Sequence, residues 1–208
     1  MNVLQPVVGK VTFEAEGAEG GPFHSRVLHV PSPSSGLTIG RGYDMKHKNK
    51  IKVRSGLRLA GLAQKDADLL SKAAGLSGMA AENFIATHKL EKFEITQKMQ
   101  VDLFNISYKE EESEARRLCS KPDVEAKFGK CDWSSLDSAI KQILVDLKFR
   151  GDYTSDARNL IQKYVVTNDT AGFLSVLSDK SKWTTFFVPN DRFQRRVNFF
   201  KANAVFKP

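Results

Sequence analysis

The sequence contains no run of roughly 18 consecutive apolar residues, the length that a membrane-spanning helix needs. It holds two cysteines, Cys119 and Cys131, and none of its four histidines lies near them in sequence. This composition argues against a zinc site built from neighbouring cysteine and histidine ligands. The two cysteines therefore fit either reduced structural thiols or a local disulfide that forms in an oxidising compartment.

The N-terminal segment MNVLQPVVGKVTF also lacks the pattern of a secretory leader. It has one early lysine, no long apolar stretch and no cleavage site of small residues. We therefore expect no signal peptide, so that action outside the cytoplasm would require another route of delivery.

Acidic residues are fewer than basic ones, 24 against 32, which gives a formal net charge of +8. Such a balance favours anionic partners, namely nucleic acid, anionic lipid or an anionic cell-wall polymer. The sign of the charge does not choose among them.

The N-terminal quarter of the chain predicts a small lobe that contains β-structure. Residues 7–17 have the apolar spacing of a short amphipathic helix, which the glycines that follow would end. Residues 29–36 form a turn-rich loop, and the glycine-bounded stretch 36–44, GLTIGRGYD, predicts a hairpin arm.

From residue 58 onward the spacing of apolar residues becomes helical. The segment 96–119 predicts one long helix, and 134–151, with a serine start and a glycine stop, predicts the central core helix. We expect an α+β fold made of one domain, 1–208, in which a lobe of about residues 18–57 packs on a helical body, 58–208, together with helix 7–17.

The glycines of GLTIGRGYD do not match a phosphate-binding loop. The sequence has no G-x-x-x-x-G-K-[ST] motif, and no helix clearly opens after these glycines. Nucleotide binding is therefore not expected from this segment.

Acidic residues near the predicted helix end suggest a different chemistry. Glu14, Glu16 and Glu19 lie where helix 7–17 gives way to glycines, while Thr38 and Asp44 lie on the predicted hairpin. Glycoside hydrolysis needs one acid to protonate the leaving oxygen and a second group to hold water or stabilise the charged sugar. Spacing alone leaves open whether these residues are catalytic or merely solvated.

Two longer motifs resemble the phage-type lysozymes, and within them the pesticin-like muramidase domains of bacterial toxins. The first is a Glu-Gly pair at a helix end, followed by the insertion HVPSPSS and the block SGLTIGRGYDM at residues 35–45. The second is KWTTFFVPNDRFQRR at residues 182–196. Together they bracket about 180 residues, so the resemblance covers nearly the whole chain.

The resemblance implies a lysozyme-like fold with an active-site cleft between lobe and body. It implies Glu16 as the general acid, with Glu19 as the alternative, Thr38 as the residue that helps hold water, and Asp44 as the second acid. Both acids precede a glycine, and we prefer Glu16 because it follows Phe13 by one helical turn and stands 22 residues before Thr38, close to the spacing in pesticin-like domains. No metal or cofactor is implied, and Arg41 and Tyr43 are weaker candidates for contacts with sugar.

The implied activity is that of a muramidase, which cleaves the β-1,4 bond between N-acetylmuramic acid and N-acetylglucosamine. The pesticin-like insertion favours an antibacterial toxin or effector domain whose producer carries an immunity protein. We expect a monomer that binds peptidoglycan, without nucleic acid or membrane insertion, and that reaches the periplasm of a target bacterium by a non-Sec route. The alternatives are a non-catalytic basic module that binds wall glycan or nucleic acid, and a phage endolysin.

Two further features have structural explanations. Arg192, Arg195 and Arg196 form a basic group that we expect to make structural ion pairs, although such a cluster also fits a nucleic-acid patch. Trp133 and Trp183 are expected in the core.

Overall fold

A computed structural model describes residues 3–21 and 24–206 of the chain. The chain divides into two compact units, residues 1–107 and 108–208, and the boundary falls inside one long helix. We describe each unit by itself. The prediction of one domain with a lobe boundary near residue 57 stays a prediction.

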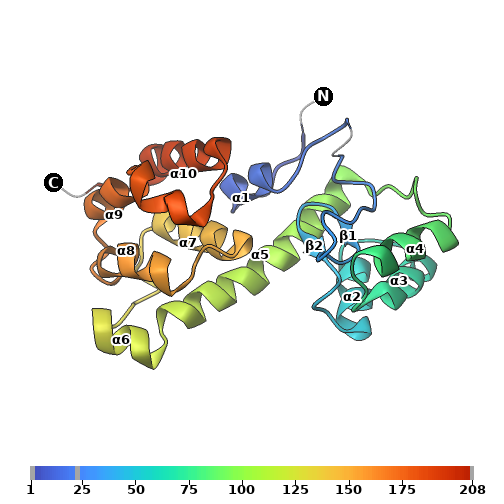
Figure 1. The fold of residues 1–208 in the computed structure, drawn as a ribbon, viewed down its shortest axis with the longest axis horizontal. Coiled ribbons are helices and arrows are strands. Elements are labelled where there is room, and N and C mark those ends of the chain that lie inside the picture. The colour runs from blue at the N-terminus through green and yellow to red at the C-terminus, as the bar shows by residue number, and fades with distance from the viewer. Residues whose placement is uncertain (1–2, 22–23, 207–208) are drawn as a thin grey trace. The chain divides into compact units, whose positions relative to one another are not determined.

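The protein belongs to the α+β class, being mostly helical with a small two-stranded antiparallel sheet (Figure 1). Unit 1 contains, in order, α1 (Lys10–Ala15), β1 (Thr38–Ile39), β2 (Tyr43–Asp44), α2 (Lys50–Leu59), α3 (Gln64–Leu70), the 3-10 helix η1 (Ser71–Ala73), α4 (Met79–Thr87) and the first half of α5 (Gln97–Cys119). The coarse fold class predicted from the sequence is therefore confirmed.

The strands β1 and β2 form the hairpin that the glycine-bounded segment predicted. Thr38 pairs with Asp44 and Ile39 pairs with Tyr43. The connection between them includes Gly40 and Gly42, whose φ angles of 66° and 81° lie in the left-handed region that favours glycine.

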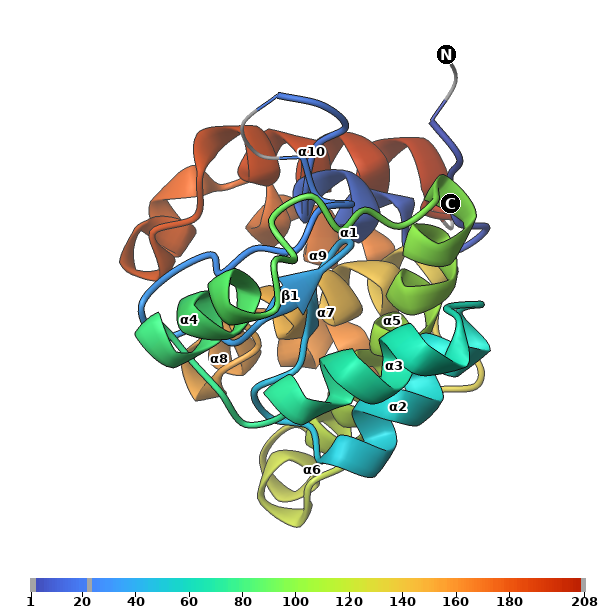
Figure 2. The ribbon, with the colours of Figure 1, turned by 90° about the vertical axis from the view of Figure 1, so that its right-hand side faces the viewer.

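The core of unit 1 forms where the hairpin packs against the helices that follow it. Leu37, Ile39 and Met45, from the hairpin and its flanks, are fully buried together with Val53 and Leu57 of α2. Figures 1 and 2 show α2, α3 and α4 gathered on one side of the hairpin. The hairpin thus packs against the helices of unit 1 through a shared hydrophobic core.

The first helix is shorter than the predicted 7–17. It begins after Gly9, which has a φ of 80°, and ends at Ala15, so that Glu16 is its C-cap residue. Val7 is 95% exposed and does not contribute the apolar face that was predicted for it. The helix keeps only one buried turn, around Val11 and Phe13.

Unit 2 consists of the second half of α5 and the helices that follow it. These are α6 (Pro122–Phe128), α7 (Ser138–Arg150), α8 (Ser155–Val166), α9 (Thr170–Leu177), the 3-10 helix η2 (Lys180–Phe186) and α10 (Asn190–Asn203). Helix α7 is the most deeply buried of them, as predicted for the central helix, and Gly151 ends it in a left-handed conformation. Its start differs from the prediction, because Asp137 rather than Ser134 caps it by accepting from the N–H groups of Ala139 and Ile140.

Polar groups inside unit 2 confirm the structural ion pairs that were predicted for two of the three arginines, Arg192 and Arg196. Arg192 and Arg196 of α10 form buried ion pairs with Asp146 of α7. Trp133 and Trp183 are buried as expected.

The two cysteines are buried free thiols, and their Sγ atoms lie 2.8 Å apart. Within the described residues, no helix combines the length and the apolar character that crossing a membrane demands.

Candidate functional site

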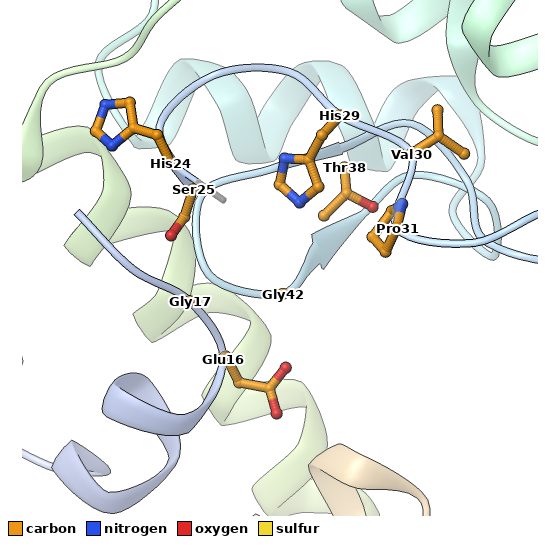
Figure 3. A pocket seen from close by; sticks show the side chains of 9 residues that line it. All are labelled: Glu16, Gly17, His24, Ser25, His29, Val30, Pro31, Thr38 and Gly42. Atoms are coloured by element: carbon orange, nitrogen blue, oxygen red, sulfur yellow. The ribbon is translucent and has the colours of Figure 1, made fainter. Parts of the chain in front are cut away.

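A pocket of about 490 Å³ opens in unit 1, between the end of α1 and the hairpin region (Figure 3). Two of the predicted site residues, Glu16 and Thr38, line it. The described residues that line the pocket are Glu16, Gly17, His24, Ser25, His29, Val30, Pro31, Thr38 and Gly42.

Glu16 reaches the pocket because α1 ends at this residue. Its backbone N–H bonds to the carbonyl of Thr12, and its half-buried side chain leaves the helix at the last turn. The next residue must be small, because a Cβ placed on Gly17 would lie 2.2 Å from Oγ of Ser25. Gly17 therefore allows the chain to pass close to Ser25, and Glu16 directly before it places its carboxyl group at the pocket.

Thr38 reaches the pocket from β1. It is 4% exposed, and its hydroxyl donates to the carbonyl of Gly36 at 3.2 Å. Because a hydroxyl carries one proton and two lone pairs, Oγ1 of Thr38 can still accept a hydrogen bond from a bound molecule.

Arg41 holds α1 against the hairpin. Its guanidinium lies 4.1 Å from the centre of the Phe13 ring and donates to the Phe13 carbonyl at 2.6 Å. A guanidinium that both stacks on a ring and donates a hydrogen bond holds its partner residue in a defined position. This contact fixes the position of Glu16, three residues after Phe13, relative to Thr38.

Asp44 lies directly across the hairpin from Thr38, but its carboxylate is engaged with the backbone. Oδ1 accepts from the N–H of Lys46 at 2.7 Å, and Oδ2 accepts from the N–H of Gly36 at 3.1 Å. It is not among the described residues that line the pocket. The carboxylate of Asp44 thus stabilises the hairpin through hydrogen bonds to its backbone.

The two weaker candidates for sugar contacts are buried. Arg41 is 5% exposed and Tyr43 is 1% exposed. The hydroxyl of Tyr43 lies 3.5 Å from the carbonyl of Val53 in α2. Their packing gives both residues structural tasks and leaves little of their surface for a sugar.

Glu19, the alternative acid, lies inside a network of hydrogen-bond donors and cations. Oε2 is 2.9 Å from Nε of Arg26, and Oε1 is 2.5 Å from Nε2 of Gln100 and 3.7 Å from the guanidinium of Arg41. Burial raises the pKa of Glu19, but the hydrogen bonds from Gln100 and Arg26 and the charges of both arginines outweigh it, so its pKa lies below the usual value of 4.5. Such a group stays ionised and is poorly suited to donate a proton at neutral pH.

Replacing Glu19 with glutamine is expected to lower the free energy of unfolding at pH 7 by about 1.5–3 kcal/mol, because charge-assisted hydrogen bonds are lost. The folded-state pKa is lowered, so the carboxylate stabilises the fold above its unfolded pKa and loses this effect as the pH falls through the folded value. The difference between wild type and variant should therefore shrink as the pH falls below 4.5. Urea unfolding followed by circular dichroism at neutral and acidic pH measures both; a difference that does not change with pH would contradict the role of the network.

The pocket also contains His24 and Ser25, which could suggest a serine hydrolase. The Ser25 hydroxyl donates to the carbonyl of Ala18 at 2.7 Å, and His24 accepts from the N–H of Gly20 at Nδ1 while Nε2 contacts Glu94. Both residues therefore have structural partners, and no histidine–serine hydrogen bond of a nucleophilic pair is found among the described residues.

Residues 29–31 also line the pocket, although the sequence indicated only a turn-rich loop there. His29 forms an isolated bridge with Thr38, which local sequence does not reveal. In the described part of the chain, no group of three or more His, Cys, Asp or Glu side chains forms a cluster that could hold a metal ion.

Comparison with known proteins gives a family without an assigned activity. The profile of a family described as a domain of unknown function, DUF8812, matches residues 9–197. No curated protein matches the chain. The matched region covers the pocket, the hairpin and most of α10, and the chain therefore belongs to the DUF8812 family.

Proposed function

We propose that this protein is a peptidoglycan hydrolase, a muramidase with a lysozyme-like fold that cleaves the β-1,4 bond between N-acetylmuramic acid and N-acetylglucosamine. One observation carries the proposal: Glu16 and Thr38, which the lysozyme-like motifs pair as acid and water-holding residue, line the same pocket although they are 22 positions apart. The pocket lies within the size range of small-molecule sites.

The two residues take complementary roles in this reaction. Glu16 donates a proton to the glycosidic oxygen, so that the leaving sugar departs as an alcohol. Thr38 accepts a hydrogen bond from the attacking water with the lone pairs that its bond to Gly36 leaves available. Figure 3 shows Glu16 on the opposite side of the pocket from Thr38, which leaves room for the scissile bond between them.

Asp44 enters the proposal as the second acid of the motif. Residues directly opposite in an antiparallel pair share one face, so Asp44 lies on the same face of the hairpin as Thr38. A carboxylate at that place can stabilise the positive charge that develops on the sugar, while its bonds to Gly36 and Lys46 fix its orientation.

Purified protein is expected to lower the turbidity of a suspension of isolated peptidoglycan, with release of fragments that end in reducing N-acetylmuramic acid. Mass spectrometry of the fragments identifies the reaction, because hydrolysis adds one water to each cleaved bond. Anhydro-muramic acid products would instead indicate a lytic transglycosylase. Binding to the wall without any released sugar would support the non-catalytic module and contradict the proposal.

The same activity fits an antibacterial toxin or effector domain that acts on the wall of a target cell. The net charge of +8 supports binding to an anionic wall polymer. In that setting the producing cell would need an immunity protein that covers the pocket.

A further inference from the structure

His29 forms part of the same surface as Thr38. The N–H of His29 donates to the carbonyl of Thr38 at 3.0 Å, and the N–H of Thr38 donates to the carbonyl of His29 at 2.9 Å. Because directly opposed residues of an antiparallel pair project to the same face, the two side chains lie side by side. Figure 3 shows both on one side of the pocket.

The hydrogen bonds of His29 determine which ring nitrogen faces the pocket as an acceptor. Nδ1 lies 2.9 Å from the carbonyl oxygen of Val27. A carbonyl can only accept, so Nδ1 carries the proton, and in the neutral ring Nε2 has a lone pair. Nε2 of His29 has no hydrogen-bond partner among the described residues, and Figure 3 shows it directed towards the side where Glu16 lies.

Nε2 of His29 is therefore an acceptor within the pocket that Glu16 and Thr38 also line. A water molecule that donates one proton to Nε2 keeps its lone pairs available for attack on a sugar. Glu16 lies across the pocket, on the side towards which Nε2 is directed. A water held in this way is oriented to attack a sugar whose leaving oxygen is bound by Glu16.

We propose that His29 is the general base of the proposed glycoside hydrolysis, an assignment that rests on the proposed function. As the water oxygen bonds to C1 of the muramic acid, one O–H bond breaks and its proton passes to Nε2 of His29. The bond from C1 to the leaving oxygen breaks at the same time, and that oxygen takes the proton of Glu16. His29 then gives its proton to solvent and Glu16 takes one back, which restores both groups.

The geometry favours His29 over Asp44 for this step. Both oxygens of Asp44 accept from backbone N–H groups, whereas Nε2 of His29 is left for a ligand. An acid and a base on opposite sides of the bond, with water between base and sugar, produce inversion at C1. Cleavage of the β-linked glycan should therefore release the α anomer first.

The test uses the full chain and a soluble glycan of alternating N-acetylglucosamine and N-acetylmuramic acid. His29→Ala is expected to lower kcat by about 100- to 10,000-fold with little change in KM, because the base acts in the transition state. Added imidazole should restore part of the lost rate in His29→Ala, and should do nothing for Glu16→Gln. The matched control is His47→Ala, an exposed histidine next to the hairpin, which should keep the wild-type rate with or without imidazole.

A second variant separates chemistry from packing. His29→Asn can still donate an amide N–H to Val27 but has no basic nitrogen, so it should fold as wild type and be as inactive as His29→Ala. Full activity of folded His29→Asn, a folded His29→Ala that imidazole does not rescue, or release of the β anomer by wild type would each overturn the assignment. Failure of wild type to cleave the glycan at all would instead refute the proposed function.

Discussion

Replacing Glu16 with glutamine is expected to lower the rate of peptidoglycan cleavage by about 100- to 10,000-fold, the usual contribution of a general acid. The amide keeps the size of the side chain but has no acidic proton for the leaving oxygen. Since Glu16 is half-buried at the end of a short helix and its exchange leaves the backbone hydrogen bond to Thr12 intact, the fold should be unaffected. Turbidity loss and fragment release measure activity, and circular dichroism checks the fold.

The matched control for Glu16 is Glu19→Gln, which removes a carboxylate of the same kind three residues further along the chain. That variant should lose stability but, at a temperature where it remains folded, cleave the glycan at close to the wild-type rate. Wild-type activity of Glu16→Gln together with an inactive, folded Glu19→Gln would move the acid to Glu19 and refute the assignment. The two carboxyls are thus distinguished by opposite effects on rate and stability.

The Glu-Gly pair at residues 16 and 17 could be recognised from the sequence, because Gly17 packs against a residue nearby in the chain. A side chain at this position would collide with Ser25. The glycine after Glu16 therefore indicates in the sequence that two segments of the chain pass close to each other. The surroundings of Glu19 are different, because Gln100, Arg26 and Arg41 meet there from three separate parts of the chain. No local pattern reports such a network, and only the structure shows which acid is held as a carboxylate.

The hairpin, the long helix α5 and the end of α7 follow short-range rules, and the sequence predicted them. Gly40 and Gly42 adopt positive φ angles, and Gly151 ends α7 in the same way. The start of α7 was predicted too early because serine and aspartate are both good N-cap residues. Asp137 is the cap in the structure, and it directly precedes the helix whose buried residues begin with Ala139 and Ile140.

Helix α2 was not predicted, because the sequence indicated a β-containing lobe up to about residue 57. The segment has a glycine at position 56, which is unfavourable inside a helix, and two of its four apolar residues, Ile51 and Leu59, are exposed. In the structure that glycine is needed for packing, because a Cβ there would lie 2.3 Å from the Tyr43 hydroxyl. The same contact explains why Tyr43, proposed for sugar binding, is buried instead.

The pairing of His29 with Thr38 was also not predictable from the sequence. Its neighbours Pro31 and Pro33 indicate an irregular loop, and the pairing of His29 with Thr38 joins that loop to the hairpin without any regular strand. Loop residues that are positioned by a rigid element are frequent sites of function. Here the rigid element is β1, which rests on α2 and the rest of the unit 1 core.

Replacing Asp146 with asparagine is expected to lower the free energy of unfolding of unit 2 by about 3–5 kcal/mol, the usual cost of breaking a buried ion pair. Asp146 is fully buried on α7, with Arg192 at 2.7 Å and Arg196 at 2.5 Å. Burial raises the pKa of Asp146, but the charges of Arg196 and Arg192 outweigh it and hold the pKa below 3.8. An amide at this place would leave two buried guanidiniums with Asp152 as the remaining acid, which pairs with Arg196 at 2.8 Å.

Urea unfolding followed by tryptophan fluorescence measures this loss selectively, because both tryptophans of the chain, Trp133 and Trp183, are buried in unit 2. The matched control is Glu114→Gln, which removes an acid from an exposed pair with Arg117 and should leave the urea midpoint nearly unchanged. A loss below about 1 kcal/mol in Asp146→Asn would contradict the structural role of the ion pairs.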